Sequence, residues 1–204
     1  MLIWVGTYLD GLKLVVWSSM KIMQMPPSKL LEQACTRARH KQSCGMTQKF
    51  THSTYLQNAN DTAALGRWFS HHVILGDTLL LSGPIGAGKT HFARALIQSK
   101  VGELEDVPSP SFTLVQTYEA PDFDIWHADL YRLSHPEEVV ELGLEDAFSS
   151  AVCLVEWPDR LGQATPKSAL WLEFAAQDEG RLVTVSGSPR FDLAFALLED
   201  WPNK

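Results

Sequence analysis

Residues 78–90 read Thr-Leu-Leu-Leu-Ser-Gly-Pro-Ile-Gly-Ala-Gly-Lys-Thr, and this stretch decides the fold. Its first five residues form a short apolar run, which is typical of a strand buried in a parallel sheet. Its last eight residues match the pattern G-x-x-x-x-G-K-[ST], and the segment 90–100 that follows predicts a helix. A buried strand, a glycine-rich loop and a helix in this order predict a P-loop that binds a nucleoside triphosphate.

The residues of the loop suit phosphate binding for separate physical reasons. Gly86 and Gly88 allow the backbone to curl so that successive N–H groups converge on phosphate oxygens. The N-terminus of the following helix adds the positive end of its dipole. Lys89 can reach the β- and γ-phosphates as a point charge, and the Thr90 hydroxyl can ligate Mg²⁺. A nucleoside triphosphate and Mg²⁺ are therefore the expected ligands.

A P-loop also needs an acid for the metal and a group that positions water, and two carboxylates are candidates. Glu156 follows the apolar run 151–155, at the carboxyl end of a predicted strand, where open α/β sheets bind their ligands. Asp129 shares one face of a predicted strand with His127, two residues earlier. It could hold Mg²⁺ indirectly or orient the attacking water. A surface carboxylate at Glu156, or a capping or ion-paired group at Asp129, fits the same positions.

Two neighbouring segments give weaker signals. Ser109–Leu114 lies between the P-loop helix and the next predicted strand, as a switch loop would, and a hydroxyl there could sense the γ-phosphate. An ordinary Ser/Pro turn fits the same residues equally well. Trp157, beside Glu156, is interpreted as packing at a strand end.

Apolar patterning along the rest of the chain predicts an α/β fold. Strands that alternate with helices indicate a mixed, mainly parallel central sheet with antiparallel strands at its edge. The expected strands cover 47–55, 78–82, 112–118, 123–130, 151–155, 169–174 and 181–186; the expected helices cover 63–69 (with capping residues at 60–62), 90–100, 136–142 and 191–198.

Composition excludes several classes of protein. The chain has 204 residues, of which 45% are hydrophobic and 20% charged, so disorder over the whole length is excluded. The sequence contains no apolar run of 18 residues, and no membrane-spanning helix is expected. Three cysteines are too few for a disulfide framework and indicate a reducing compartment, so a cytoplasmic location is expected. Cys35, His40 and Cys44 match no standard zinc pattern.

The charge is unevenly distributed between the first 45 residues and the remainder. Residues 1–45 hold six Lys or Arg and two Asp or Glu, a charge of +4, so a net charge of −7 leaves −11 on the rest. An acidic body is a poor nucleic-acid binder, and any link to nucleic acid is expected to run through a partner. Residues 1–45 are interpreted as a disordered or dispensable extension, with a mitochondrial-type transit peptide as the alternative, and 46–204 as the working domain.

Four motifs in one order resemble a known family. The segments GPIGAGKT, SPSFTLVQTY, HADLYRL and VEWPDRLG, at these separations, are similar to the TsaE (YjeE) family of P-loop ATPases in tRNA threonylcarbamoyladenosine (t6A) biosynthesis. The resemblance covers about residues 50–190 and leaves residues 1–45 outside. It implies a three-layer P-loop sandwich and slow ATP hydrolysis, stimulated by the partner proteins TsaB and TsaD. It also implies that tRNA is contacted only through that complex and that no membrane is involved.

The resemblance also assigns site residues, motif by motif. It makes Thr90 and Glu156 the magnesium ligands and Asp129 the acid needed for hydrolysis, with Lys89 and Glu156 also in the catalytic set. Nucleotide-binding positions are Ile85, Gly86, Ala87, Gly88, Lys89, Thr90, Thr113 and Arg181, of which Arg181 is a looser match, as is the region 58–62. Ser109–Thr113 becomes the switch-like loop. The family often has Thr where Ser111 stands, and serine keeps the hydroxyl.

Two other functions fit a P-loop. A small-molecule kinase needs a lid with clustered arginines, whereas Arg132, Arg160, Arg181 and Arg190 are dispersed. A GTP-dependent switch needs an Asn-Lys-x-Asp guanine reader late in the chain, and the sequence has none. The kinase is therefore the alternative to an ATPase.

Overall fold

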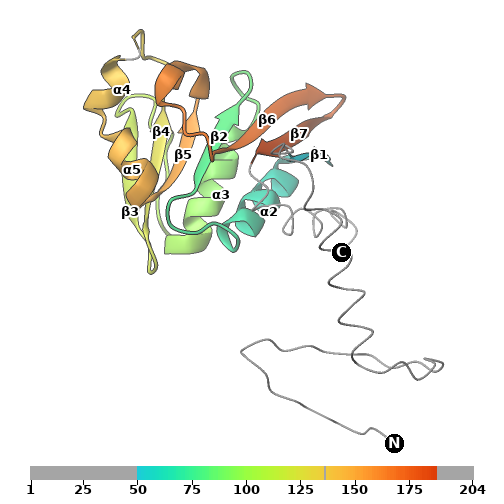
Figure 1. Cartoon of the computed structure of the whole chain (residues 1–204). Coiled ribbons are helices and arrows are strands. Elements are labelled where there is room, and N and C mark those ends of the chain that lie inside the picture. The colour runs from blue at the N-terminus through green and yellow to red at the C-terminus, as the bar shows by residue number, and fades with distance from the viewer. Residues whose placement is uncertain (1–49, 136, 188–204) are drawn as a thin grey trace, which may run out of the picture. The chain divides into compact units, whose positions relative to one another are not determined.

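A computed structural model describes residues 50–135 and 137–187 of the chain. In this part the chain forms one seven-stranded sheet with helices on both faces (Figure 1). The elements in chain order are β1 (Phe50–Leu56), α2 (Ala59–Ser70), β2 (Thr78–Ser82), α3 (Lys89–Val101), β3 (Val115–Glu119), β4 (Asp124–Asp129), α4 (Glu137–Glu141), α5 (Leu144–Ser150), β5 (Val152–Glu156), the 3₁₀ helix η1 (Pro158–Ala164), β6 (Leu170–Gln177) and β7 (Gly180–Gly187).

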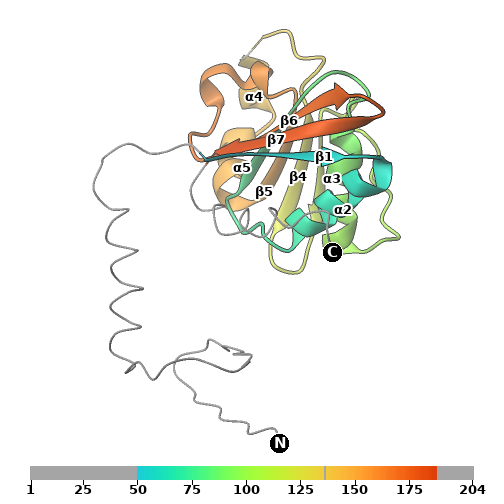
Figure 2. The same ribbon diagram turned by 90° about the vertical axis from the view of Figure 1, so that its right-hand side faces the viewer.

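The sheet is mixed, with its parallel part in the centre. The strand order is β1-β7-β6-β2-β5-β4-β3, and the pairs β6/β2, β2/β5 and β5/β4 are parallel. The pairs at both edges are antiparallel, and Figure 2 shows β1, β7 and β6 side by side at one of them. This confirms the predicted α/β fold with antiparallel edge strands.

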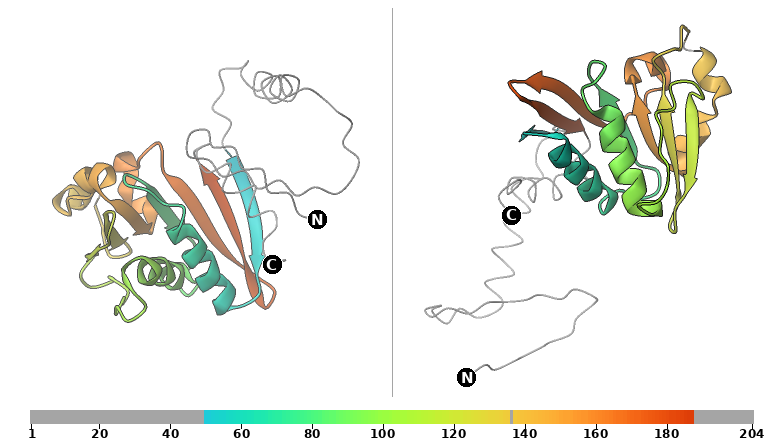
Figure 3. Two further views of the ribbon diagram at one scale, coloured as in Figure 1. Left: turned by 90° about the horizontal axis from the view of Figure 1, so that it is seen from below. Right: turned by 180° about the vertical axis from the view of Figure 1, so that it is seen from behind.

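Two hydrophobic cores, one on each face of the sheet, make the fold three-layered. Helices α2 and α3 lie side by side on one face, and α4 and α5 cover the other (Figure 3). Alternation along the buried strand β2 explains how one strand serves both cores, since Leu79 and Leu81 join the first and Leu80 joins the second. Phe69 of α2 and Phe92 of α3 meet edge-to-face, with ring centroids 5.5 Å apart.

Most predicted elements are present, with shifted ends. The strand expected at 78–82 is found there, and the P-loop helix extends one residue further at each end than the predicted 90–100. The predicted cap at 60–62 is wrong by two residues. Asn58 caps α2, because its side chain accepts hydrogen bonds from the N–H groups of Asn60 (2.8 Å) and Asp61 (3.1 Å).

Two further expectations need correction. The strand expected from 112 begins at Val115, because the Leu114 N–H donates to the Pro110 carbonyl at 2.7 Å and closes a turn. The helix expected at 136–142 is shorter, and Gly143, at φ +71°, separates it from the unpredicted α5. Helix η1 was not predicted either.

Some expectations lie outside the described residues. These are the extension at 1–45, the group formed by Cys35, His40 and Cys44, the start of the first strand at 47–49, Pro136, and the helix at 191–198. Among the residues that the structure does describe, no helix is long and apolar enough to cross a bilayer.

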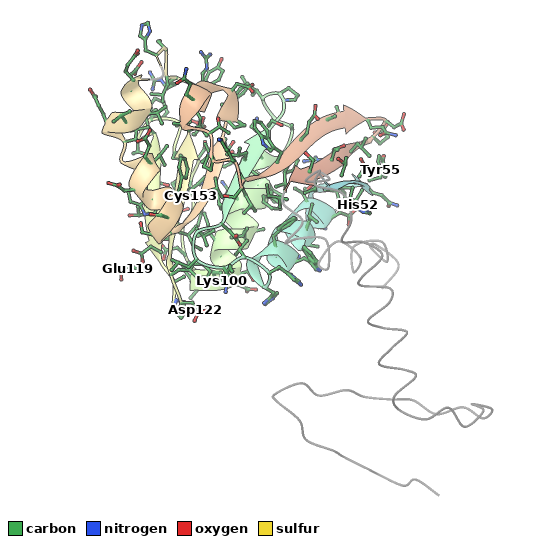
Figure 4. All side chains as sticks on the ribbon, viewed as in Figure 1. His52, Tyr55, Lys100, Glu119, Asp122 and Cys153 are labelled. Carbon is green, nitrogen blue, oxygen red and sulfur yellow. The ribbon has the colours of Figure 1, made fainter. Side chains whose placement is uncertain are left out.

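The thiol of Cys153 is expected to be unreactive in the native protein. It lies on β5 inside the sheet (Figure 4), is fully buried, and burial raises its pKa to about 12. At pH 8 this lowers the reactive thiolate population roughly a thousandfold relative to an ordinary thiol. Iodoacetamide labelling followed by peptide mass spectrometry should leave Cys153 unmodified at pH 8 and modify it in 6 M guanidinium chloride. Rapid native labelling at pH 8 would contradict this burial.

Candidate nucleotide-binding site

The candidate site lies where the central parallel strands end. Glu156, the last residue of β5, pairs in register with Leu81 of β2 on one side and with Asp129 of β4 on the other. The P-loop leaves the end of β2 immediately afterwards, so the loop and the two carboxylates meet at one edge of the sheet. This is the edge at which open α/β sheets bind ligands.

The backbone of the P-loop requires glycine where it enters α3. Gly88 is the N-cap of that helix at φ +103°, a conformation that residues with a Cβ rarely adopt. A Cβ at this position would also collide with Nη1 of Arg181, which donates a hydrogen bond to the Ala87 carbonyl at 3.1 Å. No side chain caps the helix, so the N–H groups of its first turn are left for an anion.

Lys89 is a buried cation at the base of the loop. Its side chain is 4% exposed, and Nζ donates to the carbonyls of Gly83 (2.7 Å) and Pro84 (2.9 Å). Nζ also lies 4.4 Å from the centroid of the Trp157 ring. Burial lowers the pKa of Lys89, against the opposing effect of the Glu156 and Asp129 carboxylates. A positive charge is thus held beside two acids in a poorly solvated place.

Thr90 and Glu156 are in direct contact. The Thr90 hydroxyl donates to Oε2 of Glu156 at 3.0 Å, and the other oxygen, Oε1, lies 3.0 Å from Nε2 of His127. Glu156 is 2% exposed and His127 is completely buried. Both oxygens of the carboxylate are therefore engaged.

Asp129 forms a second carboxylate cluster with the loop that precedes β3. Its Oδ2 accepts hydrogen bonds from the hydroxyls of Ser111 (2.6 Å) and Ser109 (3.3 Å), and its Oδ1 accepts from the Tyr131 N–H (3.1 Å). The Asp129 N–H donates to the carbonyl of Leu114, which has φ +64°. The serines suggested by the sequence as phosphate sensors thus contact the candidate catalytic acid.

The remaining sequence-predicted residues lie around the loop. Ile85 is 74% exposed in the P-loop between β2 and α3, and Arg181 reaches the loop from β7. Thr113 is exposed in the turn before β3 and lies beyond the two serines in the chain. The region 58–62 approaches the loop as well, since the Ala59 carbonyl is 2.9 Å from Nε2 of His91 in the first turn of α3.

Sequence reasoning missed two residues of the site. Trp157 was interpreted as packing, and its ring does touch the second core, but the Lys89 ammonium lies over it. His127 was noted only for sharing a face with Asp129. Their positions next to the two predicted acids, one residue after Glu156 and two before Asp129, were the available signal.

The donor set fits Mg²⁺ held together with a nucleotide. Among the described residues there is no group of three or more His, Cys, Asp or Glu side chains that could hold a metal alone. Mg²⁺ bound with nucleotides usually takes one or two protein oxygens, with phosphates and water for the rest. Thr90 and Glu156 supply one hydroxyl and one carboxylate in contact, which matches that requirement.

Comparison with known proteins identifies relatives of the chain. Residues 56–183 match the family model described as threonylcarbamoyl adenosine biosynthesis protein TsaE. The TsaE protein of Rickettsia bellii is 36% identical over 134 residues, which cover 66% of this chain and 93% of that protein. The TsaE protein of Bacillus subtilis is 30% identical over 139 residues, which cover 67% and 86%. The crystal structure of Bacillus subtilis YdiB superposes with a TM-score of 0.60 at 26% identity, over 76% of this chain and 97% of that one.

Proposed function

The chain belongs to the TsaE family, whose members act in the biosynthesis of t6A in tRNA, and from this premise we propose that it is a Mg²⁺-dependent ATPase of that pathway. The observation that carries the proposal is the 3.0 Å contact between Thr90 of the P-loop and Glu156 at the end of the neighbouring strand, beside the buried Lys89. A hydroxyl, a carboxylate and a buried ammonium at a helix N-terminus suit a triphosphate with its cation.

Each side chain has a separate task in this proposal. Lys89 exchanges the carbonyls of Gly83 and Pro84 for phosphate oxygens, and the free N–H groups of α3 bind the same phosphates. Thr90 and Glu156 hold the cation, which when bound neutralises charge that develops on the phosphates. Arg181 adds a positive charge at the Ala87 carbonyl, beside the nucleotide.

Asp129 is the proposed acid for hydrolysis. It is 4% exposed, accepts three hydrogen bonds and lies beside Glu156 in the β4/β5 register. A carboxylate fixed in this way can orient a water for attack and accept its proton. The hydroxyls of Ser109 and Ser111 hold Asp129 in orientation, which gives the loop before β3 a means to control hydrolysis.

The proposed partners are TsaB and TsaD, with tRNA contacted only through them. The support is the family membership together with the charge balance, since the acidic body of the chain disfavours direct phosphate-backbone contacts. Slow hydrolysis by the isolated chain, accelerated by the partners, is the expected behaviour.

Product analysis tests this function. The full chain, incubated with ATP, Mg²⁺, TsaB and TsaD, should release inorganic phosphate to water, and GTP should be a poorer ligand. Depletion of the protein in its native cell should lower the t6A content of tRNA, with recovery on re-expression. Transfer of the γ-phosphate to a metabolite in cell extract would favour a small-molecule kinase instead.

Replacing Ser111 by alanine tests the control of Asp129. We expect kcat for ATP hydrolysis to fall about tenfold with little change in KM, because a hydrogen bond to a charged acceptor contributes about 1.5–3 kcal/mol. Ser111→Thr keeps the hydroxyl and should stay within about twofold of the wild type. Ser109→Ala is the matched control, with a smaller loss, since its contact with Asp129 is longer at 3.3 Å. Equal rates for Ser111→Ala and the wild type would argue against this coupling.

A further inference from the structure

His127 is a polar side chain in a place where packing alone would favour an apolar one. It lies on β4, is completely buried, and faces the α2/α3 side of the sheet together with Ile125 and Leu154. Its Nε2 lies 3.0 Å from Oε1 of Glu156. In the described part of the chain its Nδ1 has no hydrogen-bond partner.

The hydrogen-bond inventory fixes which atom donates. An ionised carboxylate only accepts, so the contact requires the proton on Nε2 of His127. Nδ1 is a buried polar atom without a hydrogen-bond partner among the described residues, and an unpaired buried polar atom costs free energy of folding. A leucine would fill the same space without that cost. The contact between Nε2 and the Glu156 carboxylate therefore explains why an imidazole occupies this position.

The contact with His127 gives the two carboxylate oxygens of Glu156 different partners. His127 engages Oε1, which leaves Oε2 directed at the Thr90 hydroxyl. A glutamate side chain has several rotatable bonds, and ordering it costs conformational entropy. Because His127 is completely buried in the sheet and contacts Glu156 directly, the protein itself meets this entropic cost. Groups held behind a metal ligand commonly determine its affinity for the metal.

We propose that His127 is a positioning residue that holds the Glu156 carboxylate so that Oε2 is presented to the divalent cation of the bound nucleotide. The inference rests on the proposed nucleotide function and deepens it. It predicts that His127 controls affinity for the cation and leaves the affinity for nucleotide without metal unchanged.

Three substitutions separate this role from simple packing. His127→Leu fills the cavity without a donor. His127→Gln can bring an amide N–H close to the position of Nε2, whereas the shorter side chain of His127→Asn ends near Nδ1 and cannot reach Oε1. We expect the Leu and Asn chains to lose about 10- to 100-fold in cation affinity, the range found for such supporting contacts. The Gln chain should recover to within about threefold of the wild type.

The test measures Mn²⁺ binding by electron paramagnetic resonance, with the full chain and the non-hydrolysable analogue adenylyl imidodiphosphate. Nucleotide affinity in EDTA and the thermal midpoint are measured in parallel. Weakened Mn²⁺ binding in Leu and Asn, rescue in Gln, and unchanged affinity in EDTA would support the inference. If the Leu chain does not fold, the comparison of Gln with Asn decides the matter in the same way.

Two results would overturn it, and a third concerns the function itself. Wild-type Mn²⁺ affinity in the Leu or Asn chain would show that Glu156 needs no support. An equal loss in Gln and Asn, both folded, would show that the position only requires an imidazole shape. Absence of Mn²⁺-dependent nucleotide binding in the wild type would instead contradict the proposed function, and the inference with it.

Discussion

The Lys89→Ala chain is expected to bind ATP about a hundredfold more weakly than the wild type. In the structure Nζ makes hydrogen bonds of 2.7 and 2.9 Å to two loop carbonyls, and in the proposed function these donors turn to phosphate oxygens when nucleotide binds. One charge-assisted hydrogen bond contributes about 1.5–3 kcal/mol, so the loss of two, less the carbonyl contacts given up, amounts to about 3 kcal/mol. Isothermal titration with ATP and Mg²⁺ measures the difference directly.

Two control variants make this result specific. Lys89→Met retains most of the side-chain volume and should lose as much affinity as Lys89→Ala, because the charge is what matters. Lys100 belongs to the same helix but lies at its far end, where its Nζ is 3.6 Å from Oδ2 of Asp122 (Figure 4). The Lys100→Ala chain should therefore bind ATP normally. An affinity within threefold of the wild type for Lys89→Met would contradict the assignment of Lys89 to the phosphates.

The lowered pKa of Lys89 has a consequence for stability. Burial disfavours the ammonium form, so in the nucleotide-free protein its positive charge costs stability at every pH below its folded pKa, with partial compensation by Glu156 and Asp129. Phosphate oxygens offset that cost. Saturation with nucleotide at about 100 times Kd should raise the thermal midpoint of the wild type by about 5–10 °C, and that of Lys89→Met hardly at all.

The sequence predicts the strand, loop and helix that carry the site because these elements are made of contiguous residues. The apolar run before Gly83, the glycine pattern and Lys89 are contiguous, and contiguous residues determine a strand, a loop and a helix without reference to the rest of the chain. Glu156 and Asp129 follow from one additional rule, that the carboxyl ends of parallel strands meet at one edge. That rule correctly predicts their proximity.

The contacts within the site could not be predicted in the same way. Whether His127 reaches Glu156 depends on the register of β4 against β5, and one residue of slip would turn it to the other face. The two serines contact Asp129 from a loop that enters β3 through Leu114 at φ +64°, a conformation that its sequence neighbours do not predict. Helix α5 was missed because seven residues after a glycine are too short for a clear helical period.

Replacing Asp129 by asparagine is expected to lower kcat for ATP hydrolysis by at least about a hundredfold, since a positioned general base typically contributes about 10²–10⁴-fold. Asparagine retains the shape of the side chain. Its carbonyl can accept from the Tyr131 N–H, and its amide can donate to the Ser111 hydroxyl, so the loop before β3 keeps its anchor. What disappears is the negative charge that, in the proposed function, accepts a proton from the attacking water.

The Asp129→Asn chain should therefore keep its affinity for ATP while its rate of hydrolysis falls. ATP affinity should stay within about threefold of the wild type, because Asp129 contacts neither Lys89 nor Thr90 by a hydrogen bond, whereas Lys89→Ala fails at the binding step. Phosphate release is measured with TsaB and TsaD present, so that the slow basal hydrolysis expected of the isolated chain does not hide the loss. Asp124→Asn, at the exposed start of the same strand, is the control with a normal rate. A normal rate in Asp129→Asn would contradict the catalytic role of Asp129. Glu156, which contacts His127 and Thr90, would then be the remaining buried carboxylate at this edge of the sheet within the described residues.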